Sequence, residues 1–306
     1  MAFAAFGPAA LAERATPATL RKSWVAVALL APGLAYLALF FVTPLVSLLV
    51  TSLNQPVLYG DVGQYEPALR VENYWTAIEH YWPHFLRAFV YALIATIVAL
   101  AISYPVAYFI GVTARRWPFV QALALTLVIA PFFISFLLRT LAWKQILADD
   151  TPLVQFLKSI ALIPPDGHVV GTDFSVVFGL VYNFIPFMTL PIYASLERLD
   201  TRYLEAGSDL YARPATVFWK VTLPLSLPGV VSGTLLTFIP AAGDFINASD
   251  TFLGSSRTQM VGNVIEANFL VLMNYPIAAA LSVLLMGVIL VLVGVYIRRS
   301  GTEDLV

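Results

Sequence analysis

The chain has 306 residues, of which 59% are hydrophobic and 11% charged, and its mean hydropathy is +0.82. Soluble globular proteins carry about 25% charged residues, so this composition excludes an ordinary soluble fold. The formal net charge of −1 leaves no overall basic field to attract nucleic acid. The sequence has no cysteine, which excludes disulfides, thiolate metal sites and cysteine nucleophiles.

Six long stretches contain no Asp, Glu, Lys or Arg. They span residues 23–60, 88–114, 117–138, 174–196, 221–243 and 267–297. A helix rises about 1.5 Å per residue, so each stretch can cross a hydrocarbon core of about 30 Å. We therefore expect an all-α integral membrane protein with six transmembrane helices. Their expected positions are residues 24–53, 86–113, 119–146, 173–197, 225–249 and 275–297.

The basic residues are distributed unevenly between the two sides of this arrangement. With a cytoplasmic N-terminus, eleven of the 17 basic residues lie on the inner side. These are Arg14, Arg21, Lys22, Arg115, Arg116, Arg198, Arg202, Arg213, Lys220, Arg298 and Arg299. Inner loops of membrane proteins carry an excess of Lys and Arg, so both termini are predicted to be cytoplasmic.

Candidate sites for chemistry are sparse. The histidines His80, His84 and His168 are scattered without a third ligand beside them, so no metal site is expected. The sequence shows neither a nucleophile paired with a base nor a Gly-x-x-x-x-Gly-Lys-Ser/Thr phosphate loop. We expect a chain with no catalytic residues and no cofactor of its own.

The one long inner segment, residues 198–224, has the pattern of an amphipathic helix outside the membrane. Asp200 is a suitable N-cap. Apolar positions recur at helical spacing at Tyr203, Leu204, Gly207, Leu210 and Tyr211. Glu205 and Asp209 form an acidic stripe, and the small residues Ala206 and Gly207 leave the surface open to close approach by another protein.

The rest of this inner segment predicts a second short helix. Pro214 suits its first turn, and Leu223 and Pro224 are expected to end it before the fifth span. The alternative for the whole segment is an interfacial helix lying on the lipid.

At these residues the sequence resembles the EAA loop of type I ABC importer permeases. That pattern is Glu-Ala-Ala, three residues, Gly, nine residues, then Ile-x-Leu-Pro. Here the matching residues are Glu205, Ala206 and Gly207, then Tyr211, then residues 221–224, Val-Thr-Leu-Pro. The spacing is kept, but Gly207 replaces the second Ala and Tyr211 replaces the customary Gly, which predicts an altered bend at this turn.

The resemblance implies a permease of the bacterial inner membrane that works by alternating access. Residues 1–84 would hold the N-terminal segment, the first helix and an outer loop. Residues 85–295 would form the permease domain with its coupling loop at 198–224, and residues 296–306 a cytoplasmic tail. The implied partners are membrane lipid, a second permease subunit, two ATPase subunits that bind ATP and Mg, and an external solute-binding protein. The ATPase contacts would be Tyr203, Leu204, Glu205, Ala206, Gly207, Asp209, Leu210 and Tyr211.

Further stretches resemble permeases of spermidine/putrescine importers. These are residues 131–135, 138–143, 182–187 and 238–245. The group usually continues through a Pro to Leu-Leu-Gly-Gly, where this chain has residues 247–255 instead. The resemblance implies a polyamine path, with Asp244, Tyr182 and Asp250 as its candidate residues.

Asp244 follows Pro240 and Gly243 at the end of a charge-free stretch, where an unpaired carboxylate is costly. It is expected either to meet a cationic cargo or to form a structural ion pair with Arg139 or Arg257. Two alternatives to polyamine import stay open. One is the same architecture carrying a sugar, an anion or a metal chelate, and the other is a membrane enzyme or scaffold unrelated to ATPases.

Overall fold

The structure is a computed structural model that describes residues 24–300. The expected inner residues Arg14, Arg21 and Lys22, and the tail residues 301–306, lie outside this range. The chain divides into two compact units, residues up to Ser47 and residues from Leu48 onward, and each is described by itself.

The first unit contains most of the first predicted span. Helix α1 (Trp24–Leu37), the π-helical turn η1 (Ala38–Val42) and the start of α2 (Thr43–Ser52) follow one another without a break. The large apolar side chains from Val27 to Val46 are exposed, as lipid-facing side chains are.

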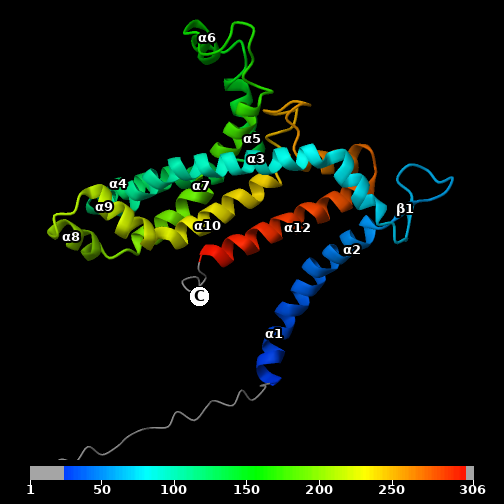
Figure 1. The fold of residues 1–306 in the computed structure, drawn as a ribbon, viewed down its shortest axis with the longest axis horizontal. Coiled ribbons are helices and arrows are strands. Elements are labelled where there is room, and N and C mark those ends of the chain that lie inside the picture. Colours follow the sequence, from blue (N-terminus) through cyan, green and yellow to red (C-terminus); the bar gives the residue numbers. More distant parts are fainter. Residues whose placement is uncertain (1–23, 301–306) are drawn as a thin grey trace, which may run out of the picture. The chain divides into compact units, whose positions relative to one another are not determined.

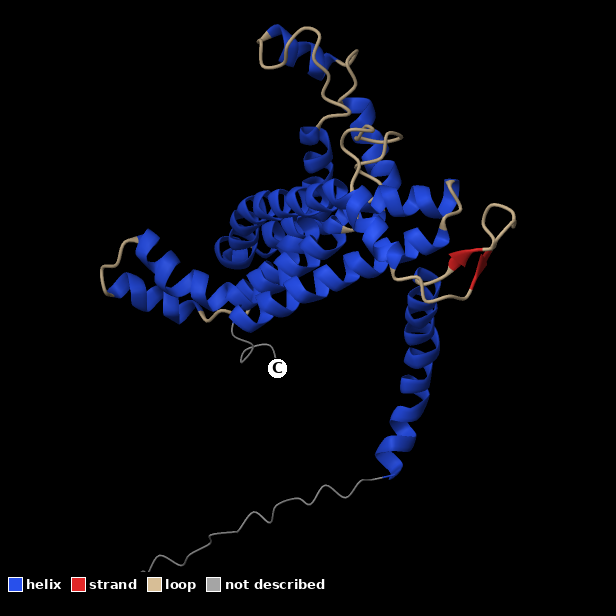
Figure 2. Ribbon diagram, turned by 45° about the vertical axis from the view of Figure 1, so that its right-hand side comes forward, coloured by secondary structure: helices blue, strands red, loops and turns tan. Residues whose placement is uncertain are grey.

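The second unit is mostly helical (Figure 1). Its helices are α3 (Glu72–Tyr108), η2 (Phe109–Thr113), η3 (Ala114–Arg116), α4 (Pro118–Ile129), η4 (Ala130–Phe133), α5 (Phe136–Ile146), α6 (Pro152–Ser159), α7 (Asp173–Glu197), α8 (Thr201–Asp209), α9 (Pro214–Val217), η5 (Phe218–Thr222), α10 (Leu223–Ala242), α11 (Val261–Glu266), η6 (Ala267–Val271) and α12 (Tyr275–Ser300). The short strands β1 (Gln55–Pro56) and β2 (Tyr65–Glu66) pair antiparallel in the ribbon drawn red in Figure 2.

The core forms where α3, α7, α10 and α12 pack together. Alanines on one face of α3 are fully buried there, at Ala88, Ala92, Ala95 and Ala99. On α10, Gly229 and Gly233 lie against α7, and an added Cβ at Gly229 would stand 2.6 Å from the Pro191 carbonyl oxygen. Helices surrounded by lipid associate through such small residues, because close backbone approach supplies the packing energy.

The third predicted span is broken. Within the described residues, five helices are long and apolar enough to cross a membrane, or six if the pair Pro118–Phe133 and Phe136–Ile146 counts as one. The two members of this pair meet at an angle of 97°. Ile134 and Ser135 have extended ψ angles of 135°, so the helical hydrogen bonding stops between them. The expectation of one continuous helix over 119–146 was wrong.

The second and fifth spans also begin earlier than predicted. Helix α3 starts at Glu72 rather than near 86. The fifth span runs from Pro214 through η5 to Ala242, so Leu223 and Pro224 do not end the short helix. A proline ring clashes with the carbonyl of residue i−4 in an α-helix, here Lys220. Lys220 lies in η5, whose i→i+5 bonding leaves a wider turn, and the helix continues through Pro224.

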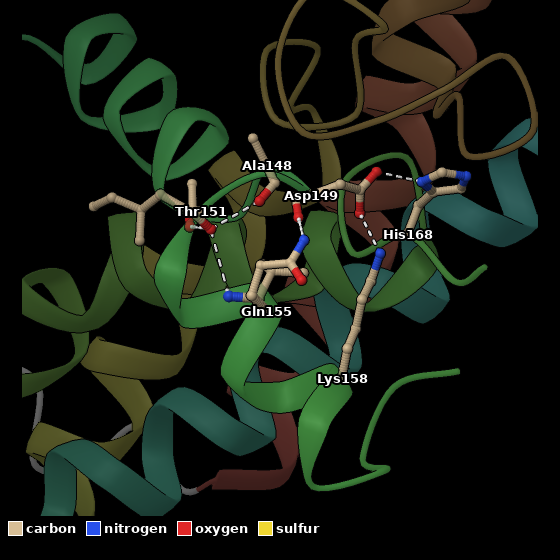
Figure 3. A network of polar contacts seen from close by, with 8 residues as sticks. Ala148, Asp149, Thr151, Gln155, Lys158 and His168 are labelled. Carbon is tan, nitrogen blue, oxygen red and sulfur yellow. Dashed lines mark hydrogen bonds and ion pairs between the residues drawn. The ribbon is translucent and has the colours of Figure 1, made fainter. Parts of the chain in front are cut away.

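The segment after α5 is held by a polar network around Asp149 (Figure 3). Its carboxylate pairs with Lys158 at 3.4 Å and with His168, and its carbonyl accepts from Gln155 at 2.8 Å. The hydrogen bond to His168, helped by the one to Lys158, holds the pKa of Asp149 below its usual range. The side chain of Thr151 caps α6 by accepting from the Val154 amide.

The α7–α10 contact yields a stability prediction. Gly229→Ala should destabilise the chain by about 1–3 kcal/mol, because the new methyl group overlaps the α7 backbone. Gly287→Ala on α12 is the matched control, since an added Cβ there meets nothing within 4 Å. Thermal unfolding in detergent measures both variants, and equal melting temperatures would contradict this description of the core.

Candidate functional site

Helix α8 is capped at its first turn as the sequence predicts. The Asp200 side chain accepts a hydrogen bond from the Arg202 amide at 3.0 Å. Pro214 occupies the first position of α9, also as predicted. Figure 1 shows α8 and α9 together at one end of the second unit, beyond the end of α7. The segment 198–224 therefore contains two short helices before the fifth span.

The turn between α8 and α9 contains a residue in the left-handed backbone conformation. Tyr211 has a φ of 55°, in the left-handed region that glycine adopts without strain. The Ala212 amide donates to the Gly207 carbonyl at 3.1 Å, which is the 6→1 bond of a Schellman helix end. Tyr211 adopts this left-handed conformation at a cost of about 1–2 kcal/mol.

Gly207 allows close packing within the segment 198–224 rather than leaving an exposed surface. An added Cβ would lie 2.8 Å from a Val217 methyl group, so the missing side chain lets α8 rest on α9. Ala206 is exposed instead. The interpretation that Gly207 bares the helix for another protein therefore needs correction.

Tyr203 on α8, and Leu210 and Tyr211 in the turn after it, are open to solvent. Tyr203, Leu210 and Tyr211 are 59%, 81% and 97% exposed. The acidic side chains Glu205 and Asp209 are exposed beside them. Two aromatic rings and a leucine projecting from a short capped helix make a surface that another protein can cover.

Asp244 is buried without an ion pair. Its side chain is 7% exposed, and its two oxygens accept hydrogen bonds from the amide and the side chain of Asn247, at 2.8 and 3.1 Å. The ion pairs formed within residues 24–300 are Arg70–Glu72, Lys158–Asp149 and His168–Asp149. The expected structural pair of Asp244 with Arg139 or Arg257 is therefore wrong, because the Asn247 donors satisfy the carboxylate locally.

Asn247 connects Asp244 to a buried polar cluster. Asn183 on α7 donates to Asn247 Oδ1 and to Thr140 Oγ1, both at 3.1 Å. Arg139, beside Thr140 on α5, is 8% exposed, and its Nε and Nη1 have no acceptor among the described residues. Its guanidinium lies 5.7 Å from the centre of the Phe136 ring. This cluster holds the loop after α10 against α5 and α7.

Tyr182 and Asp250 lie in different cavities. Tyr182 lines an apolar cavity of about 560 Å³ beside Pro105, Pro131 and Pro186. Asp250 lines a smaller one of about 220 Å³. The structure does not bring the three predicted path residues into one site.

Glu266 is a candidate that the sequence analysis missed. It lines the cavity of Asp250 together with Gln259 and Asn263. In the sequence Glu266 only marked the beginning of a charge-free stretch, and nothing local showed that α11 would bring it beside Asp250. The cavity thus has two carboxylates in its lining, beside the apolar residues Ala267, Leu270 and Val271.

Within residues 24–300, no group of three His, Asp or Glu side chains is placed to hold a metal ion.

Comparison with known proteins places the chain in a family. Residues 126–300 match the family described as the binding-protein-dependent transport system inner membrane component. The chain belongs to this family. It is therefore a multi-pass transport subunit of the bacterial inner membrane, as expected from the loop motif and the apolar helices.

The curated relatives include two spermidine/putrescine transport system permease proteins named PotB. The Haemophilus influenzae protein is 37% identical over 207 residues, 68% of this chain and 71% of its own length. The Escherichia coli K12 protein is 33% identical over 266 residues, 87% of this chain and 94% of its own length. The similarity to this group expected from the sequence is confirmed.

Solved structures show the same fold at lower identity. A bacterial ABC transporter that imports the acidic polysaccharide alginate matches with a TM-score of 0.67 and 16% identity, over 92% of this chain and 97% of that one. The MetNI methionine ABC transporter matches with a TM-score of 0.53 and 20% identity, over 74% and 95%. The expected ABC importer permease fold is confirmed.

Replacing Tyr211 or Tyr203 with glycine should have opposite effects on the stability of the segment 198–224. Tyr211→Gly should stabilise the α8–α9 turn by about 1 kcal/mol, because glycine adopts the positive φ freely. Tyr203→Gly, in the interior of α8, should destabilise it by about 0.5 kcal/mol. Hydrogen exchange over residues 201–217 measures both changes, and faster exchange in Tyr211→Gly would contradict the strain at this turn.

Proposed function

We propose that the chain is the permease subunit of an ATP-driven importer of polyamines such as spermidine and putrescine. The observation that carries the proposal is the similarity to two PotB proteins across most of this chain, at 33% and 37% identity. The permease crosses the membrane six times, with the bent pair α4 and α5 as its third span. Both termini lie in the cytoplasm.

The charge distribution supports this orientation. The loop with α8 and α9 carries Arg198, Arg202, Arg213 and Lys220, whereas the only Lys or Arg of the sequence between residues 147 and 172 is Lys158. The positive-inside rule then places α8 in the cytoplasm and α6 outside.

ATP binding and hydrolysis by the partner subunits drive transport through contact with α8. The sequence has no phosphate-binding loop, so ATP and Mg are bound by separate ATPase subunits. The exposed apolar face formed by Tyr203, Leu210 and Tyr211 docks on an ATPase, with Glu205 and Asp209 at its rim. Closure of the ATPases around ATP moves α8, and the cavity between this chain and a second permease subunit changes its open side. An external binding protein delivers the cargo.

The cargo path runs past carboxylates. Asp250 and Glu266 face one cavity, and a polyamine presents several ammonium groups spaced along an aliphatic chain. Carboxylates attract these groups, and an aromatic ring such as that of Tyr182 adds cation–π attraction of about 0.5–2 kcal/mol. Asp244 acts on the same path through Asn247, which it holds against Asn183.

The orientation can be tested on a chain that has no native cysteine. In spheroplasts, a membrane-impermeant maleimide should label Asp166→Cys at once but should label Glu205→Cys only after permeabilisation. Both side chains are exposed, so access from one side alone decides the result. The unmodified chain is the blank, and the reverse pattern would overturn the orientation.

Uptake of labelled spermidine by cells carrying the complete importer tests the cargo. Asp250→Asn and Glu266→Gln should each lower the uptake rate about fivefold, as the loss of a partly exposed charge contact of about 1 kcal/mol predicts. Asp166→Asn removes an exposed carboxylate from the segment after α5 and should leave uptake unchanged. Equal uptake by all three variants would show that Asp250 and Glu266 do not lie on the cargo path.

Asp244→Asn belongs to the same experiment, with subunit abundance as a second measurement. A carboxylate on the path predicts normal abundance with reduced uptake. A purely structural cap predicts low abundance instead, because Asn loses an acceptor for the Asn247 side chain. ATP-driven uptake of another solute with no polyamine uptake would overturn the polyamine assignment and leave the importer architecture intact.

A further inference from the structure

Arg115 connects two helices at the base of the coupling loop. It lies in η3, directly after the π-helical end of the second span. Its guanidinium donates hydrogen bonds to the carbonyls of Leu196 at 2.6 Å and Leu199 at 3.1 Å, and also to those of Glu197 and Gly111. One side chain thus binds carbonyls from the end of α7 and from η2.

Two of these carbonyls, those of Leu196 and Glu197, stand at the C-terminal end of α7, and the Leu196 carbonyl also accepts from the Leu199 amide at 3.2 Å. The last four carbonyls of a helix have no partner within it, and a cation at that end also interacts favourably with the helix dipole. Guanidinium offers five N–H donors in a fixed planar fork, so it can bind several carbonyls at once. Lysine has a single nitrogen and cannot cover carbonyls in two directions equally well.

The backbones of the two elements are in close contact beside this side chain. An added Cβ at Gly111 would stand 3.1 Å from the Leu196 Cβ and 3.5 Å from the Glu197 amide nitrogen. Leu196 and Leu199 are buried, at 0% and 7% exposed. The end of α7 therefore cannot move far from η2 without breaking the bonds of Arg115.

Helix α8 begins two residues beyond Leu199. Asp200 caps it, and the Tyr203 amide donates to the Asp200 carbonyl at 3.1 Å. The chain between the carbonyls bound by Arg115 and the first turn of α8 is thus too short to absorb a displacement of α8. Arg116, the next residue, is exposed instead and lies 6.0 Å from the centre of the Trp117 ring.

We propose that Arg115 is a positioning residue that transmits movement of α8 to the second span, α3 and η2, by holding the end of α7 against η2. This inference rests on the proposed function, in which α8 docks on an ATPase. It assigns a role to a residue that contacts neither the ATPase nor the cargo.

The test uses the complete importer in proteoliposomes, with its ATPase, second permease subunit and binding protein. ATP hydrolysis and spermidine uptake are measured per assembled complex for Arg115→Gln, Arg115→Lys and Arg116→Gln. Arg115→Gln should lower the spermidine transported per ATP about threefold or more, within the range of substitutions along a coupling network. Arg115→Lys should give an intermediate ratio. Arg116→Gln, which removes the same charge one residue away, should match the unmodified importer.

A second measurement does not depend on cargo or nucleotide. Spin labels on Ile102→Cys, at an exposed site on α3, and on Glu205→Cys report the distance between α3 and α8 in the permease complex in detergent. Arg115→Gln should broaden this distance distribution, whereas Arg116→Gln should not. If Arg115→Gln cannot be purified, Arg115→Lys carries both measurements.

Two results would overturn the inference. One is an unchanged transport ratio with a narrow label distance in the Arg115 variants. The other is a proportional loss of hydrolysis, uptake and abundance with a narrow distance, which is the behaviour of a structural residue only. An unmodified complex without ATP-driven uptake would instead count against the proposed function, and the label distances would still test the connection made by Arg115.

Discussion

The close contact of α7 with α3 and α10 is the constraint on which the rest of the second unit depends. Lipid supplies little hydrophobic drive between helices, so their association relies on backbones that can approach closely. Buried alanines on α3 and the pair Gly229 and Gly233 on α10 provide that approach. Because α7 is enclosed on both sides, its position in the bundle is fixed, with the polar cluster at Asn183 in its middle and its C-terminal end at the base of α8.

The packing around α7 also determines where the buried polar side chains lie. Gly179 on α7 leaves the space that Asn247 fills, since an added Cβ would lie 2.5 Å from Asn247 Oδ1. Asn247 in turn satisfies Asp244 and accepts from Asn183. The buried carboxylate of Asp244 therefore accepts hydrogen bonds from Asn247 on the same loop rather than forming an ion pair. The guanidinium of Arg139, which the sequence suggested as that partner, packs on Phe136 instead.

Features that depend on local sequence signals could be predicted from the sequence, and features that depend on tertiary packing could not. The fourth span, the Asp200 cap and the start of α9 at Pro214 depend on charge-free length and on capping, so they were predictable. The 97° break of the third span and the pairing of Asp250 with Glu266 in one cavity depend on tertiary packing, which no local pattern encodes. The continuation of the helix through Pro224 was missed because a proline commonly marks a helix end, and no local pattern predicted the π-helical turn η5 before it.

Those π-helical turns have a further consequence for coupling. η2 lies near the end of the second span and η5 near the start of the fifth. The centre of the Phe218 ring in η5 lies 5.4 Å from that of Tyr104 and 6.5 Å from that of Tyr108, both in the last turns of α3 before η2. η5 thus packs against the last turns of α3, directly before η2, at the end of the unit where α8 and α9 lie. A π-helical turn has weaker hydrogen-bond geometry than the α-helix around it, and such turns are frequent at functional sites. In the proposed coupling, movement of α8 would reach these two turns, which are cheaper to rewind than the α-helices beside them.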